Sequence, residues 1–128
     1  MAYRALVVED DQVTQLALMR ILEAEGLDVD RAGDGGPAIK LLSERDYDVV
    51  LLDIVLPTVS GTIVMEHLRQ TRPAMLERVI VVSGLDVQEI RTLFPAVCEA
   101  LAKPVFPARL RAVVRDCIEG ASQADTAM

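Results

Sequence analysis

The sequence predicts an α/β fold in which helices cover both faces of a parallel sheet. Apolar runs such as Leu6-Val7-Val8 and Val79-Ile80-Val81-Val82 are nearly continuous, which is typical of strands buried on both faces. These runs alternate with longer amphipathic stretches, in the βαβα order of a parallel sheet. Five such units fill the chain, and the sequence contains no internal repeat.

Five strands are expected from the apolar runs. The second is expected at an edge of the sheet, because Leu27 and Val29 alternate with Asp28 and Asp30. The expected strands cover residues 4–8, 28–32, 49–53, 78–82 and 100–102.

Five helices are expected between and after these strands. Gly26 is placed to end the first helix, Asp34 and Asp86 are placed to cap the second and fourth, and Pro107 suits the first turn of the fifth. The first helix is expected to bury a wide apolar stripe that includes Val13 and Leu16. The expected helices cover residues 12–25, 34–42, 60–68, 86–94 and 107–120.

The domain is expected to cover residues 1–120. Residues 121–128 are small and polar and have no apolar period, so we expect a flexible tail or a linker stub there. The sequence leaves open whether a further domain follows.

Composition indicates a single globular domain. The chain has 128 residues, of which 52% are hydrophobic and only 3% aromatic, so its core must be built from aliphatic side chains. The formal net charge of −7 argues against direct nucleic-acid binding, which requires a basic surface. No apolar stretch approaches the roughly 20 residues of a membrane span, and the first residues lack a secretory-signal pattern. We therefore expect a cytoplasmic protein with no membrane contact.

The two cysteines, Cys98 and Cys117, have neither the spacing of a zinc site nor the density of a disulfide-stapled scaffold. We expect them to be free thiols in a reducing cytosol.

Polar residues follow four of the apolar runs. Asp53 ends the third strand, Glu9 and Asp10 follow the first, Ser83 follows the fourth, and Lys103 follows the fifth. The carboxyl ends of parallel strands form one edge of the sheet, which is where ligands bind in open α/β folds. These side chains are therefore expected to lie close together.

This set of groups suits phosphoryl chemistry around a metal ion. Adjacent carboxylates repel one another unless a cation neutralises them, and oxygen ligands favour Mg²⁺. A carboxylate can attack phosphorus, while a lysine and a hydroxyl bind the phosphoryl oxygens. Each residue alone has a common structural explanation, such as a helix cap or a turn. Their joint occurrence at successive strand ends is the specific observation.

These residues resemble a known family. Val7-Val8-Glu9-Asp10-Asp11, Leu51-Leu52-Asp53-Ile54-Val55-Leu56-Pro57 with Gly61, Val82-Ser83-Gly84 and Lys103-Pro104 are similar to the motifs of the receiver domain of two-component response regulators. The resemblance covers residues 4–119. It implies a flavodoxin-like (βα)5 fold with strand order 2-1-3-4-5.

The resemblance also implies a role for each residue at the strand ends. Asp53 would accept a phosphoryl group from a histidine kinase or a histidine phosphotransfer protein, in a self-catalysed and Mg²⁺-dependent reaction. Glu9, Asp10, Asp53 and the backbone carbonyl of Val55 would hold Mg²⁺. Ser83 and Lys103 would bind the phosphoryl oxygens. The output would pass through protein contacts, to a downstream effector protein or a fused output domain.

The chain departs from the family pattern near its fourth helix, fifth strand and fifth helix. In receivers these three elements form the common output face, so the resemblance implies that they carry the signal. Ala100 stands where receivers usually carry Tyr or Phe, a ring that turns inward when the Ser or Thr moves toward the phosphate. Phosphorylation is therefore expected to be read out without this aromatic switch, unless Phe94 or Phe106 substitutes for the ring. Val55 and Leu85 are apolar at the two positions that flank the path of the hydrolytic water. We therefore expect slow self-dephosphorylation.

Other functions are left open by the sequence. One is a receiver-like interaction module that is never phosphorylated. Another is a phosphohydrolase with Asp53 as nucleophile, although the haloacid-dehalogenase pattern would place a second Asp where this chain has Val55. The sequence does not decide whether the chain forms a homodimer through its fourth and fifth helices, nor does it identify the kinase or the pathway.

Overall fold

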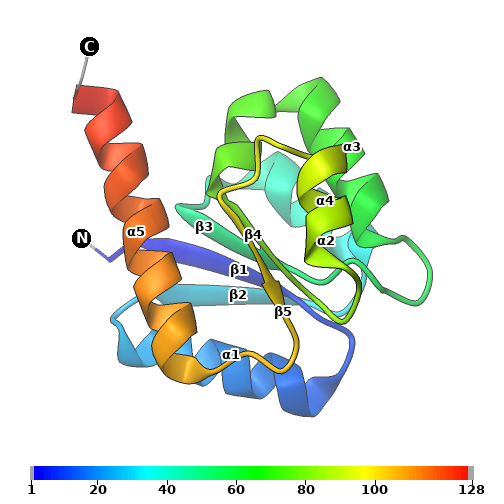
Figure 1. Cartoon of the computed structure of the whole chain (residues 1–128), viewed down its shortest axis with the longest axis horizontal. Helices are drawn as coiled ribbons and strands as arrows, with labels where there is room; N and C mark the ends of the chain where they lie inside the picture. Colours follow the sequence, from blue (N-terminus) through cyan, green and yellow to red (C-terminus); the bar gives the residue numbers. More distant parts are fainter. Residues whose placement is uncertain (1, 127–128) are drawn as a thin grey trace.

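The computed structural model describes residues 2–126. It contains the expected sheet of five parallel strands, in the order β2-β1-β3-β4-β5 (Figure 1). The predicted α/β fold, strand order and edge position of the second strand are therefore confirmed. The strands are β1 (Arg4–Val8), β2 (Asp28–Ala32), β3 (Val49–Leu52), β4 (Val79–Ser83) and β5 (Glu99–Ala102).

Helices cover both faces of this sheet (Figure 1). They are α1 (Gln12–Ala24), α2 (Gly35–Glu44), α3 (Gly61–Thr71), α4 (Val87–Leu93) and α5 (Pro107–Thr126), with a 3₁₀ helix, η1 (Pro73–Arg78), between α3 and β4. One buried cluster joins the sheet to α1 and α5, and a second joins the opposite face to α2, α3 and α4.

Capping hydrogen bonds mark three helix starts, and they confirm the two caps expected at Asp34 and Asp86. Asp11 caps α1 by accepting from the N–H of Thr14, and Asp34 and Asp86 cap α2 and α4. Gly26 has a φ of 88°, the left-handed conformation that favours glycine after a helix.

Two expectations about helices are wrong. The backbone of α5 stays helical past Gly120 to Thr126, because one glycine lowers helix stability without ending a helix. Residues 127–128 of the expected tail lie outside the described residues. On α1 the buried stripe is narrower than expected, because Val13 and Leu16 are 77% and 42% exposed.

The expectation of free thiols is also wrong. Cys98 and Cys117 form a disulfide between the residue before β5 and the middle of α5. Their Cα atoms are 6.1 Å apart, within the usual range for a disulfide. The two cysteines lie 19 positions apart, and this spacing in the sequence gave no sign that the fold brings them together.

The strand registers align the residues that follow the strands. Val8 pairs with Leu52, so Glu9 and Asp53 come next at the same level. Ser83 pairs with Ala102, so Lys103 stands one residue beyond Ser83. The sheet thus carries the polar strand ends to one edge.

Candidate functional site

Three charged side chains meet at the carboxyl edge of the sheet. The ammonium nitrogen Nζ of Lys103 lies 2.8 Å from Glu9 Oε2 and 2.9 Å from Asp53 Oδ2. Both carboxylates are nearly buried, with Glu9 2% and Asp53 5% exposed. The expected convergence of strand ends is confirmed for these residues, and one ammonium group bridges two buried carboxylates.

Burial and pairing shift the pKa values of two of these groups. Burial raises the pKa of Glu9, the hydrogen bond from Lys103 opposes that rise, and repulsion by Asp53 adds to it. For Lys103 burial acts against the charged form, but hydrogen bonds and attraction to both carboxylates outweigh burial and raise its pKa. Lys103 is therefore held as a cation.

Asp10 completes an acidic cluster. Carboxylate oxygens of Glu9, Asp10 and Asp53 all lie within 4.8 Å of one another, and Asp10 is exposed to solvent. Because three carboxylates face one ammonium group, the cluster has a net negative charge. Oxygen donors that combine this charge with access to water suit a hard divalent cation such as Mg²⁺, which retains several of its waters. The donor set therefore fits the expected metal.

Backbone groups fix the orientation of Asp53. The N–H of Val55 donates to Asp53 Oδ1 at 3.0 Å, which leaves Lys103 on the other carboxylate oxygen. The N–H of Asp53 itself donates to the carbonyl of Val8 at 3.0 Å. The loop that follows β3 thus holds the Asp53 carboxylate, and the neighbouring strand end holds the Asp53 backbone.

Ser83 lies between the strand ends that carry Asp53 and Lys103. It is fully buried, and its Oγ accepts from the N–H of Leu85 at 3.2 Å. Its carbonyl accepts from the N–H of Lys103 at 2.9 Å. Because Oγ accepts from Leu85, the Ser83 hydroxyl can donate its own hydrogen toward an anion at the edge.

A comparison with known families decides the classification of this site. A model of the response regulator receiver domain matches residues 5–115. The chain belongs to this family. It is a receiver domain of two-component systems, with the flavodoxin-like fold and the acidic edge expected from its motifs.

Individual relatives agree with this classification. The aerobic respiration control protein ArcA of Escherichia coli is 35% identical over 115 residues, which are 88% of this chain and 47% of the relative. The receiver therefore spans about half the length of the curated relatives that it matches.

Solved structures support the fold. A CheY-like receiver domain protein from Methanospirillum hungatei has a TM-score of 0.87 at 27% identity, covering 97% of this chain and 99% of the other. The response regulator TrrA of Thermotoga maritima, solved in complex with Mg²⁺-BeF, has a TM-score of 0.80 at 27% identity, covering 91% and 99%.

Gln15 supports the carboxyl end of β1 in this receiver, a role that the sequence analysis missed. It is 7% exposed, and its amide nitrogen donates to the carbonyls of Glu9 (2.9 Å) and Ala32 (3.2 Å). Gln15 shares a helix face with Leu18 and Leu22, and a polar residue on the buried face of a helix was the available signal.

Asp34 supports the loop that follows β3. Besides capping α2, its Oδ1 accepts from the N–H groups of Thr58 (3.3 Å) and Val59 (3.0 Å). These hydrogen bonds, the one from Val59 foremost, lower the pKa of Asp34. The sequence indicated the cap but contained no signal for the contacts with residues 58–59.

Ala100, at the position of the missing aromatic, is buried in the core. Ala100 is 8% exposed and belongs to the buried cluster beneath α2, α3 and α4, and Phe94 packs against that cluster. Phe106 is 70% exposed. Of the two phenylalanines considered as substitutes, Phe94 therefore shares the surroundings of Ala100.

Proposed function

We propose that this receiver accepts a phosphoryl group on Asp53 from a histidine kinase or a histidine phosphotransfer protein. The supporting observation is the bridge from Lys103 to Glu9 and Asp53, beside exposed Asp10. In the reaction, a carboxylate oxygen of Asp53 attacks phosphorus and forms the O–P bond. The N–P bond of the phosphohistidine breaks, and its electron pair returns to the imidazole.

Glu9, Asp10, Asp53 and the carbonyl of Val55 would hold Mg²⁺ in this proposal. The bound ion would neutralise negative charge on the phosphoryl oxygens. The N–H of Val55 keeps Asp53 oriented for attack, as its 3.0 Å hydrogen bond to Oδ1 indicates.

Lys103 and Ser83 would bind the transferred group. Lys103 is held as a cation, and its Nζ already contacts the attacking carboxylate, so it can shift from Asp53 to a phosphoryl oxygen. The buried hydroxyl of Ser83 would donate to a second oxygen. Ser83 ends β4 and Lys103 follows β5, and these two strands are neighbours in the sheet. Both side chains therefore lie on the same side of Asp53, which follows β3.

The phosphorylated form is proposed to be long-lived. Val55 and Leu85 are 58% and 49% exposed, and both are aliphatic. Neither can orient a water by hydrogen bonding for attack on the phosphorus. Self-dephosphorylation should therefore be slow, and the domain should act as a switch and not as a hydrolase with turnover.

The phosphodonor is proposed to approach over α1 and the connection from β5 to α5. An apolar groove next to Lys103 is lined there by Val13, Ala17, Val105 and Pro107. Exposed Val13 gives this groove an apolar rim.

Among the described residues no helix is long and apolar enough to cross a membrane. We propose a cytoplasmic location, with output to an effector protein or a fused output domain.

Incubation with acetyl phosphate and Mg²⁺, followed by intact-mass measurement, tests the proposal. We expect a gain of one phosphoryl group that disappears in Asp53→Asn and persists in the matched control Asp28→Asn, which changes an exposed aspartate at the start of β2. A chelator should prevent the gain in mass.

Other results would favour the other functions. No gain in mass with acetyl phosphate or a phosphorylated histidine donor would favour an interaction module. Continuous release of inorganic phosphate without a stable phosphoprotein would favour a phosphohydrolase. A decay of phospho-Asp53 within seconds would contradict the proposed lifetime.

A further inference from the structure

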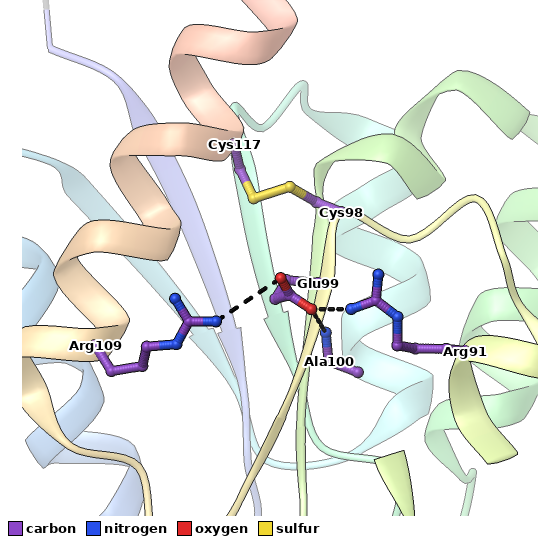
Figure 2. The surroundings of a disulfide bond; sticks show 6 residues. All are labelled: Arg91, Cys98, Glu99, Ala100, Arg109 and Cys117. Carbon is purple, nitrogen blue, oxygen red and sulfur yellow. Dashed lines mark hydrogen bonds and ion pairs between the residues drawn. A yellow bond between two sulfur atoms is a disulfide. The ribbon is translucent and has the colours of Figure 1, made fainter. Parts of the chain in front are cut away.

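The disulfide joins two elements of one face of the domain. Cys98 directly precedes β5, and Cys117 lies midway along α5 (Figure 2). β5 is an edge strand that pairs with β4 alone, and α5 lies over the sheet beside it. The bond therefore attaches α5 to an edge strand of the sheet. We refer to α4, β5 and α5 together as the α4–β5–α5 face.

The two sulfur-bearing residues differ in their access to solvent. Cys117 is 5% exposed and belongs to the buried cluster between the sheet and α5. Cys98 is half-buried and packs against the edge of that cluster. Of the two residues Cys98 is therefore the less covered, so a thiol reagent would approach the bond from its side, while Cys117 is the inner partner.

Ion pairs supply a second and weaker connection beside the disulfide. Glu99, next to Cys98, pairs with Arg91 of α4 and lies 4.0 Å from Arg109 of α5 (Figure 2). The arginine side chains are 48% and 59% exposed, and pairs this exposed contribute little to stability. The covalent bond is therefore the strong connection between β5 and α5 at this end of the strand.

The disulfide and Lys103 of the proposed phosphoryl site lie at opposite ends of β5. Cys98 precedes the strand and Lys103 follows it. The hydrogen bonds of Lys103 to Glu9 and Asp53 involve neither cysteine. A change at the disulfide can thus alter the face without removing any group of the site.

We propose that Cys98 and Cys117 are a reversible redox couple that controls how firmly α5 is held on β5. The inference concerns signal readout and, in that part, rests on the proposed function and cytoplasmic location. Disulfides in reducing compartments are typically transient and redox-sensing. The reduced domain keeps its phosphoacceptor edge, and its α4–β5–α5 face becomes mobile.

The chemistry of the couple is thiol–disulfide exchange. In oxidation, a small disulfide such as oxidised glutathione accepts two electrons from the two thiols. A mixed disulfide forms at one cysteine, and the thiolate of the other displaces glutathione, so that the protein gains one S–S bond and two glutathione thiols are released. Reduction reverses these steps, beginning with attack of a glutathione thiolate on the sulfur of Cys98, the less buried of the two cysteines.

The couple is tested first on the unmodified sequence. The protein is equilibrated in glutathione buffers from oxidising to reducing, quenched with an alkylating reagent and weighed by mass spectrometry. We expect the number of added alkyl groups to change completely from none to two as the buffers become reducing. The midpoint of this change should fall within the range of redox potentials that cellular glutathione spans. A disulfide that survives the most reducing buffer, or thiols that never pair, would overturn the proposal.

Amide hydrogen exchange tests the effect on the face. In the reduced protein we expect amides of β5 and residues 107–120 to lose protection on the order of 100-fold, and by more than amides of β1 and β3. Equal losses throughout the domain would identify a general stabilising cross-link and would overturn local control. The double variant Cys98→Ser/Cys117→Ala should reproduce the reduced state under oxidising conditions. Alanine is used at Cys117 because a serine hydroxyl would be buried there.

Phosphorylation is measured on the same samples. Oxidised and reduced protein should gain the phosphoryl group equally, and Asp53→Asn should keep the redox couple. A redox couple in a protein that is never phosphorylated would contradict the proposed function alone. Phosphorylation with an inert disulfide would contradict this inference alone.

Discussion

Glu9 and Asp53, which follow β1 and β3, are buried and each is held by polar partners, whereas the polar contacts of the α4–β5–α5 face are ion pairs to exposed arginines, beside one covalent bond. Glu9 and Asp53 are each bonded to Lys103 and to a backbone N–H. On the face, Glu99 depends on two arginines with exposed side chains.

This difference separates chemistry from readout. Groups that bind a metal and a phosphoryl group must be in position before the reaction, because reorganising them would add to the barrier. A surface that reports the state of the site must instead be able to change between arrangements of similar free energy. We propose that the α4–β5–α5 face, whose ion pairs are exposed, meets the second requirement.

The largest expected effect is at the edge, in Lys103→Met. Removing the ammonium group takes away the positive charge that faces the phosphoryl oxygens, so phosphorylation by acetyl phosphate should slow about 100-fold. The matched control is Lys40→Met, since Lys40 is exposed on α2. Rates are read from intact mass against time, and circular dichroism verifies folding. A folded Lys103→Met protein that is phosphorylated at the normal rate would break the distinction between site and face.

A smaller effect is expected in Gly61→Ala. A Cβ at Gly61 would overlap the backbone oxygen of Asp53 and come within 2.7 Å of the Cα of Ile54. Such overpacking destabilises by about 1–3 kcal/mol, and here it would also displace the backbone of Asp53. Gly36→Ala is the control, because a Cβ there meets nothing within 4 Å. Urea denaturation should show the loss only at Gly61, together with slower phosphorylation.

The sheet and its edge could be predicted because they depend on local patterns. Strands buried on both faces require continuous apolar runs, and a charge such as Asp53 can follow such a run only where the strand leaves the sheet. Parallel topology then brings Glu9, Asp53 and Lys103 together.

The features that could not be predicted depend on tertiary contacts. The Cys98–Cys117 bond exists because α5 packs beside β5, and two cysteines alone do not indicate it. Asp34 bonds to Val59 across a distance that no local pattern encodes. Val13 satisfied the helical period of α1 and is nevertheless exposed, since periodicity does not say how wide a face the sheet will cover.

The smallest expected effect is at the face, in Glu99→Gln. This change removes the charge that Arg91 and Arg109 share, and exposed pairs contribute about 0.2–1 kcal/mol. Salt should reduce the loss, because solvent ions screen such pairs. Removing the disulfide should instead cost more than the loss of these pairs, and the cost should not change with salt, because ions do not screen a covalent bond. Urea denaturation at low and high salt compares the two variants. If Glu99→Gln cost as much as loss of the disulfide, the ion pairs and not the covalent bond would hold α5 to β5.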